Sequence, residues 1–433
     1  MTEIISWYGA LIGLFLAIFL ILKGINPVYS LFFGAIIGAF IGGANLIQTV
    51  SILTSGTQSI MGTVIRVLAA GILAGVMMES GAAETIAQAV VKKLGEKKAL
   101  LALALATGLI TASGVFIPVA VLIVAPIALS VGNKMGISRL ALLLALSGGG
   151  KAGNIISPNP NTIAAANGFD LSLSDVMIAG FIPAIFGLIA TVVIASLIKN
   201  KGDKVTTDEV LALKKNDEEQ NNNPSLGKSI VAPVTAIILL MINPIGNIFH
   251  IEVLANLKID ALYVLPVAGM IGMLAMGQHR KIAMYTKSGI DKMTPTVLIL
   301  VGAGAIAGLI GASNLANQVI SIIESIGISG YYLSPISGIL MAAATASTST
   351  GVILATGTFG STIIDMGIPA ISAAVMMHTG ATVIDSLPQG NYFHVTGNSM
   401  NMSIKQRMRL IPYEALVGGT MTLVATIIYD FFI

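Results

Sequence analysis

The 433-residue chain has 55% hydrophobic and only 10% charged residues, with 23 Lys and Arg against 20 Asp and Glu. Its mean hydropathy of +0.90 lies well outside the range of soluble domains. The net charge of +3 would suit nucleic-acid binding, but the cations lie in loops between apolar spans, which excludes that function. The absence of cysteine excludes disulfides and thiolate metal sites. The composition predicts an all-α polytopic membrane protein.

Residues 1–62 are predicted to form N-terminal transmembrane helices. The apolar run from Ile4 to Leu22 matches the roughly 20 residues that cross the hydrocarbon of a bilayer. It lacks a basic start and a small-residue cleavage site, so we interpret it as a membrane anchor and not as a signal peptide.

Residues 63–198 and 296–433 are predicted to be two repeats of inverted topology. Thr63–Ala89 aligns without a gap with Thr296–Ile322, and four lysines follow the first copy whereas none follows the second before Gly330. Because positive loops stay cytoplasmic, equivalent loops of the two copies should lie on opposite faces of the membrane. Two inverted halves with a site between them are the architecture of secondary transporters.

The positions of lysine and arginine predict the topology in detail. Twenty of the 23 fall in loops that we assign to the cytoplasm, Lys258 falls outside, and Arg66 and Lys151 fall within embedded stretches. This distribution predicts about ten full crossings, with both termini outside. Arg66 lies near the outer end of its helix, from which it can reach the surface. The twenty cytoplasmic cations are Lys23, Lys92, Lys93, Lys97, Lys98, Lys134, Arg139, Lys199, Lys201, Lys204, Lys214, Lys215, Lys228, Arg280, Lys281, Lys287, Lys292, Lys405, Arg407 and Arg409.

Two apolar stretches are predicted to be re-entrant hairpins. Ala99–Val131 is too long for one span and has basic flanks on both sides, so it should enter and leave on the cytoplasmic side, with its tip at Thr111–Gly114. The equivalent hairpin of the second half should enter from outside, with its tip near Thr345–Gly351. The hydroxyl groups at these tips favour ligand contact, and small-residue helix packing is the alternative.

Each hairpin is followed by a span that is predicted to be a broken helix. Ser147–Gly168 contains three consecutive glycines, two prolines and four asparagines, and His378–Asn398 again combines Gly, Pro and polar side chains. A broken helix frees carbonyl groups for cations and directs amide groups at anions. Paired breaks therefore predict a transport site, and a merely kinked helix is the alternative.

Two segments separate the repeats. Residues 199–228 are rich in Lys, Asp, Glu and Asn and are predicted to be a flexible cytoplasmic linker, with a regulatory role as the alternative. Residues 229–295 are predicted to be connecting transmembrane helices.

Three titratable residues of the breaks are candidates for direct roles. Lys151 could attract a substrate carboxylate, pair with Asp385 across the two halves, or extend to a surface. Asp385 and His378 are candidates for proton coupling, with structural hydrogen bonding as the alternative. The residues predicted to bind substrate are Thr111, Ser113, Lys151, Asn154, Asn159, Asn161, Thr345, Ser347, Thr348, Ser349, Thr350 and Asn391.

The sequence predicts a transporter that moves a small organic anion by alternating access and has no catalytic residue, resident metal or cofactor. The coupling ion is a proton or, alternatively, sodium, for which Ser113, Asn154, Ser347 and Asp385 are the candidate ligands. No GxxxxGK[ST], HExxH or nucleophile-elbow motif occurs, which disfavours ATP-driven transport and a membrane enzyme. An ion channel is disfavoured because inverted broken helices form a central site that can be occluded.

The run GVFIPVAVLIVAPIALSVGNKMGISRLALLLAL, the PNPNT break, TASTSTGVILA and the VIDS segment at Val383 resemble the gluconate permease family of the ion-transporter superfamily. The resemblance covers nearly the whole chain. It implies two inverted repeats with re-entrant hairpins, proton-coupled uptake of sugar acids such as gluconate or of other small hydroxy acids, and a homodimer. The implied location is the inner membrane of a bacterial cell.

Overall fold

The computed structural model describes residues 5–207, 223–257, 259–315, 318, 321, 330–388 and 390–431. Helices dominate these residues, and the only β-pairing among them is an isolated bridge between Ser138 and Lys204. The predicted all-α class is therefore confirmed for the described part of the chain.

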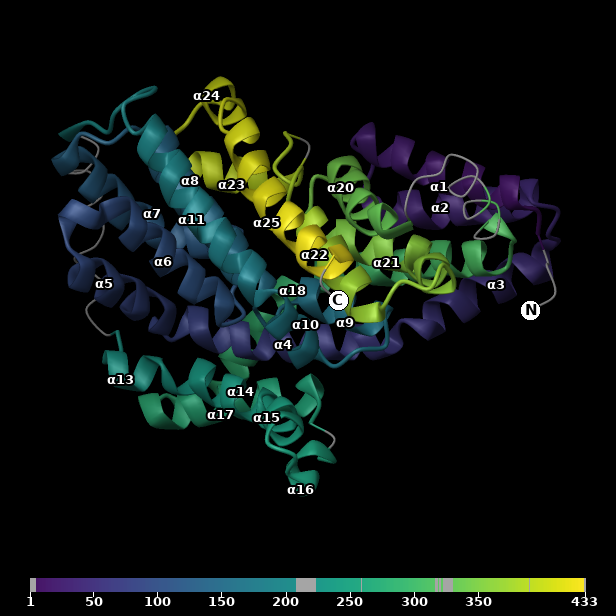
Figure 1. The fold of residues 1–433 in the computed structure, drawn as a ribbon, viewed down its shortest axis with the longest axis horizontal. Coiled ribbons are helices and arrows are strands. Elements are labelled where there is room, and N and C mark those ends of the chain that lie inside the picture. The colour runs from purple at the N-terminus through teal and green to yellow at the C-terminus, as the bar shows by residue number, and fades with distance from the viewer. Residues whose placement is uncertain are drawn as a thin grey trace.

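The helices follow one another along the chain with short connections (Figure 1). The first half contains α1 (Trp7–Leu22), α2 (Pro27–Ile41), α3 (Leu46–Ser59), α4 (Met61–Glu79), α5 (Ala82–Leu94), α6 (Ala99–Ala112), α7 (Ile117–Met135), α8 (Arg139–Ile155), α9 (Pro160–Gly168), α10 (Leu173–Ala179) and α11 (Phe181–Ile198). The second half contains α13 (Leu226–Ser229), α14 (Val231–Leu240), α15 (Ile242–Ile248), α16 (Glu252–Ala255), α17 (Ala261–Met276), α18 (Ile282–Gly311), α20 (Leu333–Thr345), α21 (Thr348–Asp365), α22 (Ala370–Gly380), α23 (Asn391–Ser399), α24 (Ile404–Met408) and α25 (Ile411–Phe431).

Many of these helices are apolar enough to cross a bilayer. Six helical segments of the described residues satisfy both length and composition: Met61–Glu79, Ile117–Met135, Arg139–Gly168, Phe181–Ile198, His279–Gly311 and Ile404–Asp430. Shorter apolar helices occur at α1, α2, α14 and α17. The chain is thus an integral membrane protein in composition and fold, and the number of crossings stays a prediction.

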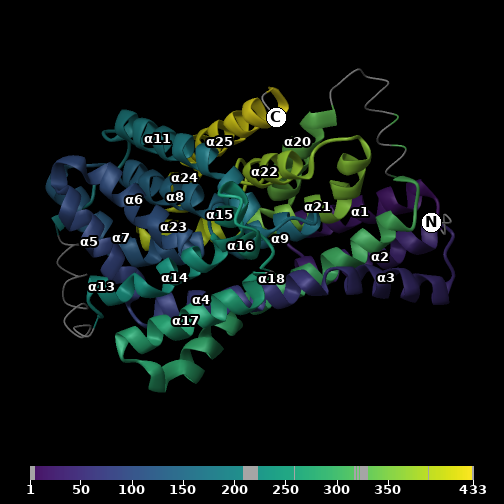
Figure 2. The ribbon, with the colours of Figure 1, turned by 60° about the horizontal axis from the view of Figure 1, so that its bottom comes forward.

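The helices α4 and α18 lie side by side along the long axis of the molecule (Figure 2). Glycines permit this close approach, since a Cβ atom on Gly289 would lie 2.0 Å from the carbonyl oxygen of Gly71. Small residues serve this purpose in membrane helices, where burial of apolar surface does not drive association. The helix α17 packs on α4 and on α14, so that these helices form a layer beneath α4 in Figure 1.

The helices of the two halves exchange partners around the breaks. The helix α9 follows the first break and packs on α21, whereas α23 follows the second break and packs on α7. The helices α11 and α25, which follow α9 and α23, pack on each other. Each half therefore contributes one side of the contact at each break. This is the arrangement expected of paired repeats, and their opposite orientation in the membrane stays a prediction.

The breaks themselves differ in part from the sequence-based prediction. The glycine triplet does not interrupt the first span, because α8 continues through it to Ile155 and the break comprises residues 156–159. The glycines instead let α8 contact α6, since a Cβ atom on Gly149 would lie 2.1 Å from the oxygen of Ala104 and one on Gly153 would lie 2.0 Å from that of Gly108. The second span is interrupted as predicted, between Gly380 and Asn391.

The predicted hairpin tips coincide with gaps between helices. The first gap is residues 113–116, between α6 and α7, and the second is residues 346–347, between α20 and α21. The backbone at Ala346 has a φ of 48°, a left-handed conformation that ends α20 abruptly. Residues 208–222 of the predicted linker lie outside the described residues.

Candidate functional site

A buried ion pair joins the two broken spans. The Lys151 ammonium group on α8 donates hydrogen bonds to Oδ1 of Asp385 and to the carbonyl oxygen of Thr382, both at 2.6 Å. The other carboxylate oxygen of Asp385 accepts a hydrogen bond of 2.6 Å from the hydroxyl of Thr348 at the second hairpin tip. The side chains of Lys151 and Asp385 are 0% and 3% exposed. The first break, the second break and one hairpin tip therefore meet at a single point.

Local backbone geometry explains how a lysine is tolerated there. The helix α22 ends at Gly380, so carbonyl groups in the following turn are free to accept hydrogen bonds from Lys151. The C-terminal end of a helix also carries partial negative charge, which favours a cation. Of the three predicted roles for Lys151, the structure shows the pairing with Asp385, and the extension to a surface is wrong because the side chain is fully buried.

Asparagine side chains organise the first break. The side-chain oxygen of Asn159 accepts hydrogen bonds from the backbone amides of Asn161 and Thr162 and so caps α9. Its amide group donates to the carbonyl oxygen and the side-chain oxygen of Asn154. Ser349 of the second hairpin tip donates to the side-chain oxygen of Asn161. The tip thus contacts both broken spans, through Thr348 on one side and Ser349 on the other.

Several buried polar atoms around the breaks have no hydrogen-bond partner among the described residues. They include the amide nitrogen of Asn154, the hydroxyls of Ser157 and Ser386, and both ring nitrogens of His378. A buried polar atom without a partner is costly, so such atoms mark positions at which groups of a bound ligand or water belong. Both breaks therefore offer unused hydrogen-bonding capacity beside the ion pair.

The other predicted residues have local roles. The hydroxyl of Thr111 donates to the Gly150 carbonyl oxygen at 3.0 Å and ties the first hairpin tip to α8. The hydroxyls of Ser113 and Thr345 donate to carbonyl groups of their own helices, and Ser347 caps α21 by accepting from the Thr350 amide. Asn391 is exposed at the start of α23 and is not part of the cluster.

A second buried ion pair was missed by the analysis of the sequence. Arg407, assigned there to a cytoplasmic loop, is 1% exposed and donates to both carboxylate oxygens of Glu414, at 2.7 and 3.1 Å. Its guanidinium group also contacts the rings of Tyr392 and Phe393. The Tyr392 hydroxyl donates to Glu414, which is itself fully buried. This cluster fixes α23, which follows the second break, to α25.

Removal of one member of this second pair should destabilise the protein strongly. Glu414→Leu leaves the Arg407 guanidinium group buried without its carboxylate, which costs about 3–5 kcal/mol. Thermal denaturation of the purified variant should show a clearly lowered midpoint. The double variant Arg407→Met, Glu414→Leu should recover much of the loss, because it leaves no unpaired charge. An unchanged midpoint in the single variant would contradict the structural role.

Helices with apolar surfaces that enclose paired charges at interrupted spans define a membrane transport protein. The chain belongs to the GntP permease family: the family model described as GntP family permease matches residues 5–432. It is a permease of the bacterial inner membrane and not an enzyme.

Known relatives extend over nearly the whole chain. An uncharacterized transporter of Haemophilus influenzae is 50% identical and covers 99% of each chain. The high-affinity gluconate transporter of Escherichia coli K12 is 24% identical over 98% of each chain. Among solved structures, the Alcanivorax borkumensis YdaH transporter, described as having an unusual topology, is similar in fold with a TM-score of 0.61, 14% identity and 90% coverage of both chains.

Proposed function

We propose that this permease takes up a sugar acid such as gluconate, or a related small hydroxy acid, by proton symport with alternating access. The substrate class is supported by the Escherichia coli relative that is named a gluconate transporter. The observation that carries the mechanism is the buried pair of Lys151 and Asp385, with 2.6 Å between the ammonium nitrogen and the carboxylate oxygen. The pair joins the two breaks, which are the best candidates for a central site.

Charge balance links anion binding to a proton. Lys151 and Asp385 together are neutral, and a substrate carboxylate that binds Lys151 displaces Asp385 and adds one negative charge to a buried site. A carboxylate that loses its cationic partner in a desolvated site binds a proton readily. The site is then neutral again, with the substrate on Lys151 and a proton on Asp385. One anion should therefore move with one proton.

The surrounding polar atoms suit a hydroxylated substrate. Asn154 and Ser157 in the first break, and Ser386 and His378 in the second, hold unpartnered donors or acceptors. A chain of hydroxyl groups can serve as donor or acceptor to each of them. We assign the carboxylate of the substrate to Lys151 and its hydroxyl groups to these atoms.

The contacts of the second hairpin tip support alternating access. Thr348 and Ser349 hold the tip to Asp385 of the second break and Asn161 of the first. Movement of this tip away from the breaks would open the buried pair to one side, and movement at the first tip would open it to the other. In this account the two repeats are inverted and the protein is a homodimer.

A sodium site at the predicted ligands is disfavoured by the charges present. Both carboxylate oxygens of Asp385 already accept hydrogen bonds, one of them from the Lys151 ammonium group. A second cation at that carboxylate would be repelled by Lys151 at close range. The hydroxyl of Ser113, another predicted ligand, is buried and donates to its own helix.

Uptake into proteoliposomes tests the proposal directly. We expect an inward proton gradient, with no sodium present, to drive accumulation of labelled gluconate above its equilibrium level. A proton ionophore should abolish the accumulation and leave exchange of internal for external gluconate intact. Accumulation that requires a sodium gradient and ignores pH would contradict proton symport. A screen of other hydroxy acids as competitors then ranks the substrates.

A further inference from the structure

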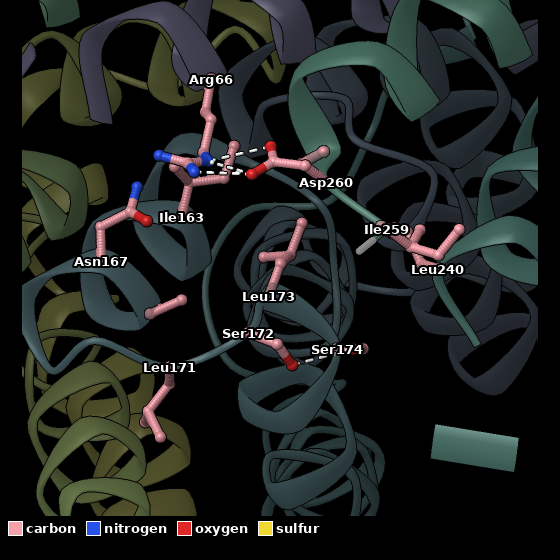
Figure 3. A pocket seen from close by; sticks show the side chains of 12 residues that line it. Arg66, Ile163, Asn167, Leu171, Ser172, Leu173, Ser174, Leu240, Ile259 and Asp260 are labelled. Carbon is pink, nitrogen blue, oxygen red and sulfur yellow. Dashed lines mark hydrogen bonds and ion pairs between the residues drawn. The ribbon is translucent and has the colours of Figure 1, made fainter. Parts of the chain in front are cut away.

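A second polar cavity lies at the other end of α9 from the paired breaks (Figure 3). It has a volume of about 70 Å³ and is lined by Arg66 and Asp260 on one side and by Asn167, Ser172 and Ser174 on the other. The helix rise of 1.5 Å per residue separates Asn159 from Asn167 by about 12 Å. The cavity therefore lies about two helical turns from the central site. In the predicted topology it opens to the outer side.

The cavity contains an ion pair at the surface. Arg66 of α4 extends to the surface, as the sequence predicted, and there donates hydrogen bonds to both carboxylate oxygens of Asp260, at 2.6 Å and 3.0–3.1 Å. The two side chains are 30% and 32% exposed, so both are accessible from solution. Burial alone would raise the pKa of Asp260, but hydrogen bonds from Arg66 and from the Leu262 amide hold this pKa below its ordinary value. Asp260 is therefore ionised at neutral pH.

Each partner keeps a second contact when the pair separates. Asp260 caps α17 and accepts a hydrogen bond of 2.8 Å from the Leu262 amide. Arg66 donates another of its N–H groups to the Gly62 carbonyl oxygen at 3.0 Å. A carboxylate from solution can thus replace Asp260 on Arg66 without leaving either group unsatisfied. The side-chain amide nitrogen of Asn167 has no partner among the described residues and offers a further donor (Figure 3).

We propose that Arg66 is an outer capture site for the carboxylate of the transported anion, and that Asp260 is the intramolecular competitor which the anion displaces. The site rests on the proposed function for the identity of its ligand. Exchange of one carboxylate for another on the same guanidinium group changes the net interaction little, which suits a site that must bind briefly and release. Charge at such a rim mainly affects the rate of encounter.

Two substitutions of the same ion pair distinguish capture from a structural contact. Arg66→Gln removes the cation and should raise the KM for gluconate uptake about fivefold, whereas Asp260→Asn removes the competitor and should lower it about threefold. Asparagine can still cap α17, and Arg66→Lys should keep the KM near that of the wild type because it keeps the charge. A purely structural pair predicts shifts in the same direction for both losses. Shifts in the same direction, or no shift, would overturn the proposal.

A matched control lies at the other end of α4. Glu79 pairs with Lys292 at 2.8 Å, and their exposures of 35% and 36% resemble those of the outer pair. Lys292→Gln should leave the KM for uptake unchanged. Gluconate transport in right-side-out and inside-out membrane vesicles then gives the side of action. We expect the Arg66 and Asp260 effects on the KM in right-side-out vesicles alone, and effects confined to inside-out vesicles would overturn the assignment to the outer face.

The two proposals fail separately. Equilibrium binding of gluconate by detergent-solubilised Arg66→Gln should stay within about twofold of the wild type, because the central site is intact. Loss of that binding would show that Arg66 supports the fold or the central site, and would overturn the capture role. If Lys151 instead proves dispensable while Arg66 and Asp260 shift the KM in opposite directions, the capture site stands and the central mechanism falls.

Discussion

Lys151→Met is expected to weaken gluconate binding about 100-fold while the protein stays folded. Methionine has a similar length, fills the same buried space and removes the cation to which the substrate carboxylate is assigned. The anion would then enter a buried site that holds no cation in direct contact, beside Asp385. Binding can be measured by thermal shift and by scintillation proximity with labelled gluconate. Unchanged affinity would contradict the assignment.

Two controls separate binding from folding. Lys134 also pairs with a carboxylate, that of Glu96 at 3.0 Å, but the two side chains are 60% and 51% exposed. Such a surface pair contributes little, so Lys134→Met should change neither affinity nor stability appreciably. Lys151→Met leaves Asp385 buried without its cation, which the double variant Lys151→Met, Asp385→Asn corrects. The double variant should regain stability without regaining affinity.

Asp385→Asn is expected to abolish uphill uptake driven by a pH gradient and to retain exchange of substrate. Asparagine has nearly the shape of aspartate and can still accept a hydrogen bond from Lys151, but it cannot bind and release a proton at this position. Exchange requires no net movement of protons and should persist. Accumulation and counterflow of labelled gluconate in the same proteoliposomes measure the two activities. A variant that still accumulates substrate against its gradient would exclude the coupling role.

Asp365→Asn is the matched control for this experiment. Asp365 is the last residue of α21 and is exposed, so its loss removes an equal charge without touching the breaks. Its accumulation and exchange should both equal those of the wild type. A parallel loss in both variants would point to a general effect of net charge instead of a specific effect at the buried pair.

Much of the site could be predicted because intramembrane charges and breaks are rare in apolar spans. Proline and asparagine near Pro158 gave the position of the first break, and the cost of an isolated buried cation predicted a partner for Lys151. The role of the glycine triplet could not be separated from a break, because glycine both loosens a helix and lets another helix approach. The contact between Gly149 and Ala104 depends on α6, whose position the sequence does not specify.

The second ion pair shows a different limit. Arg407 lies between two other cations of a loop, Lys405 and Arg409, so its sequence context indicates a cytoplasmic surface. A signal was present in Glu414, an acidic residue near the start of the apolar span that ends at Phe431, since a carboxylate there needs a partner. Which cation supplies it depends on the path of α24, and that path follows from packing against α23.

The number of protons taken up when the substrate binds tests the central claim most directly. Gluconate titrated into purified protein in buffers of different ionisation enthalpy reports this number by calorimetry. The account predicts uptake of about one proton per anion bound by the wild type near neutral pH, and of none by Asp385→Asn. Binding by the wild type without proton uptake would contradict the exchange of Asp385 for substrate on Lys151.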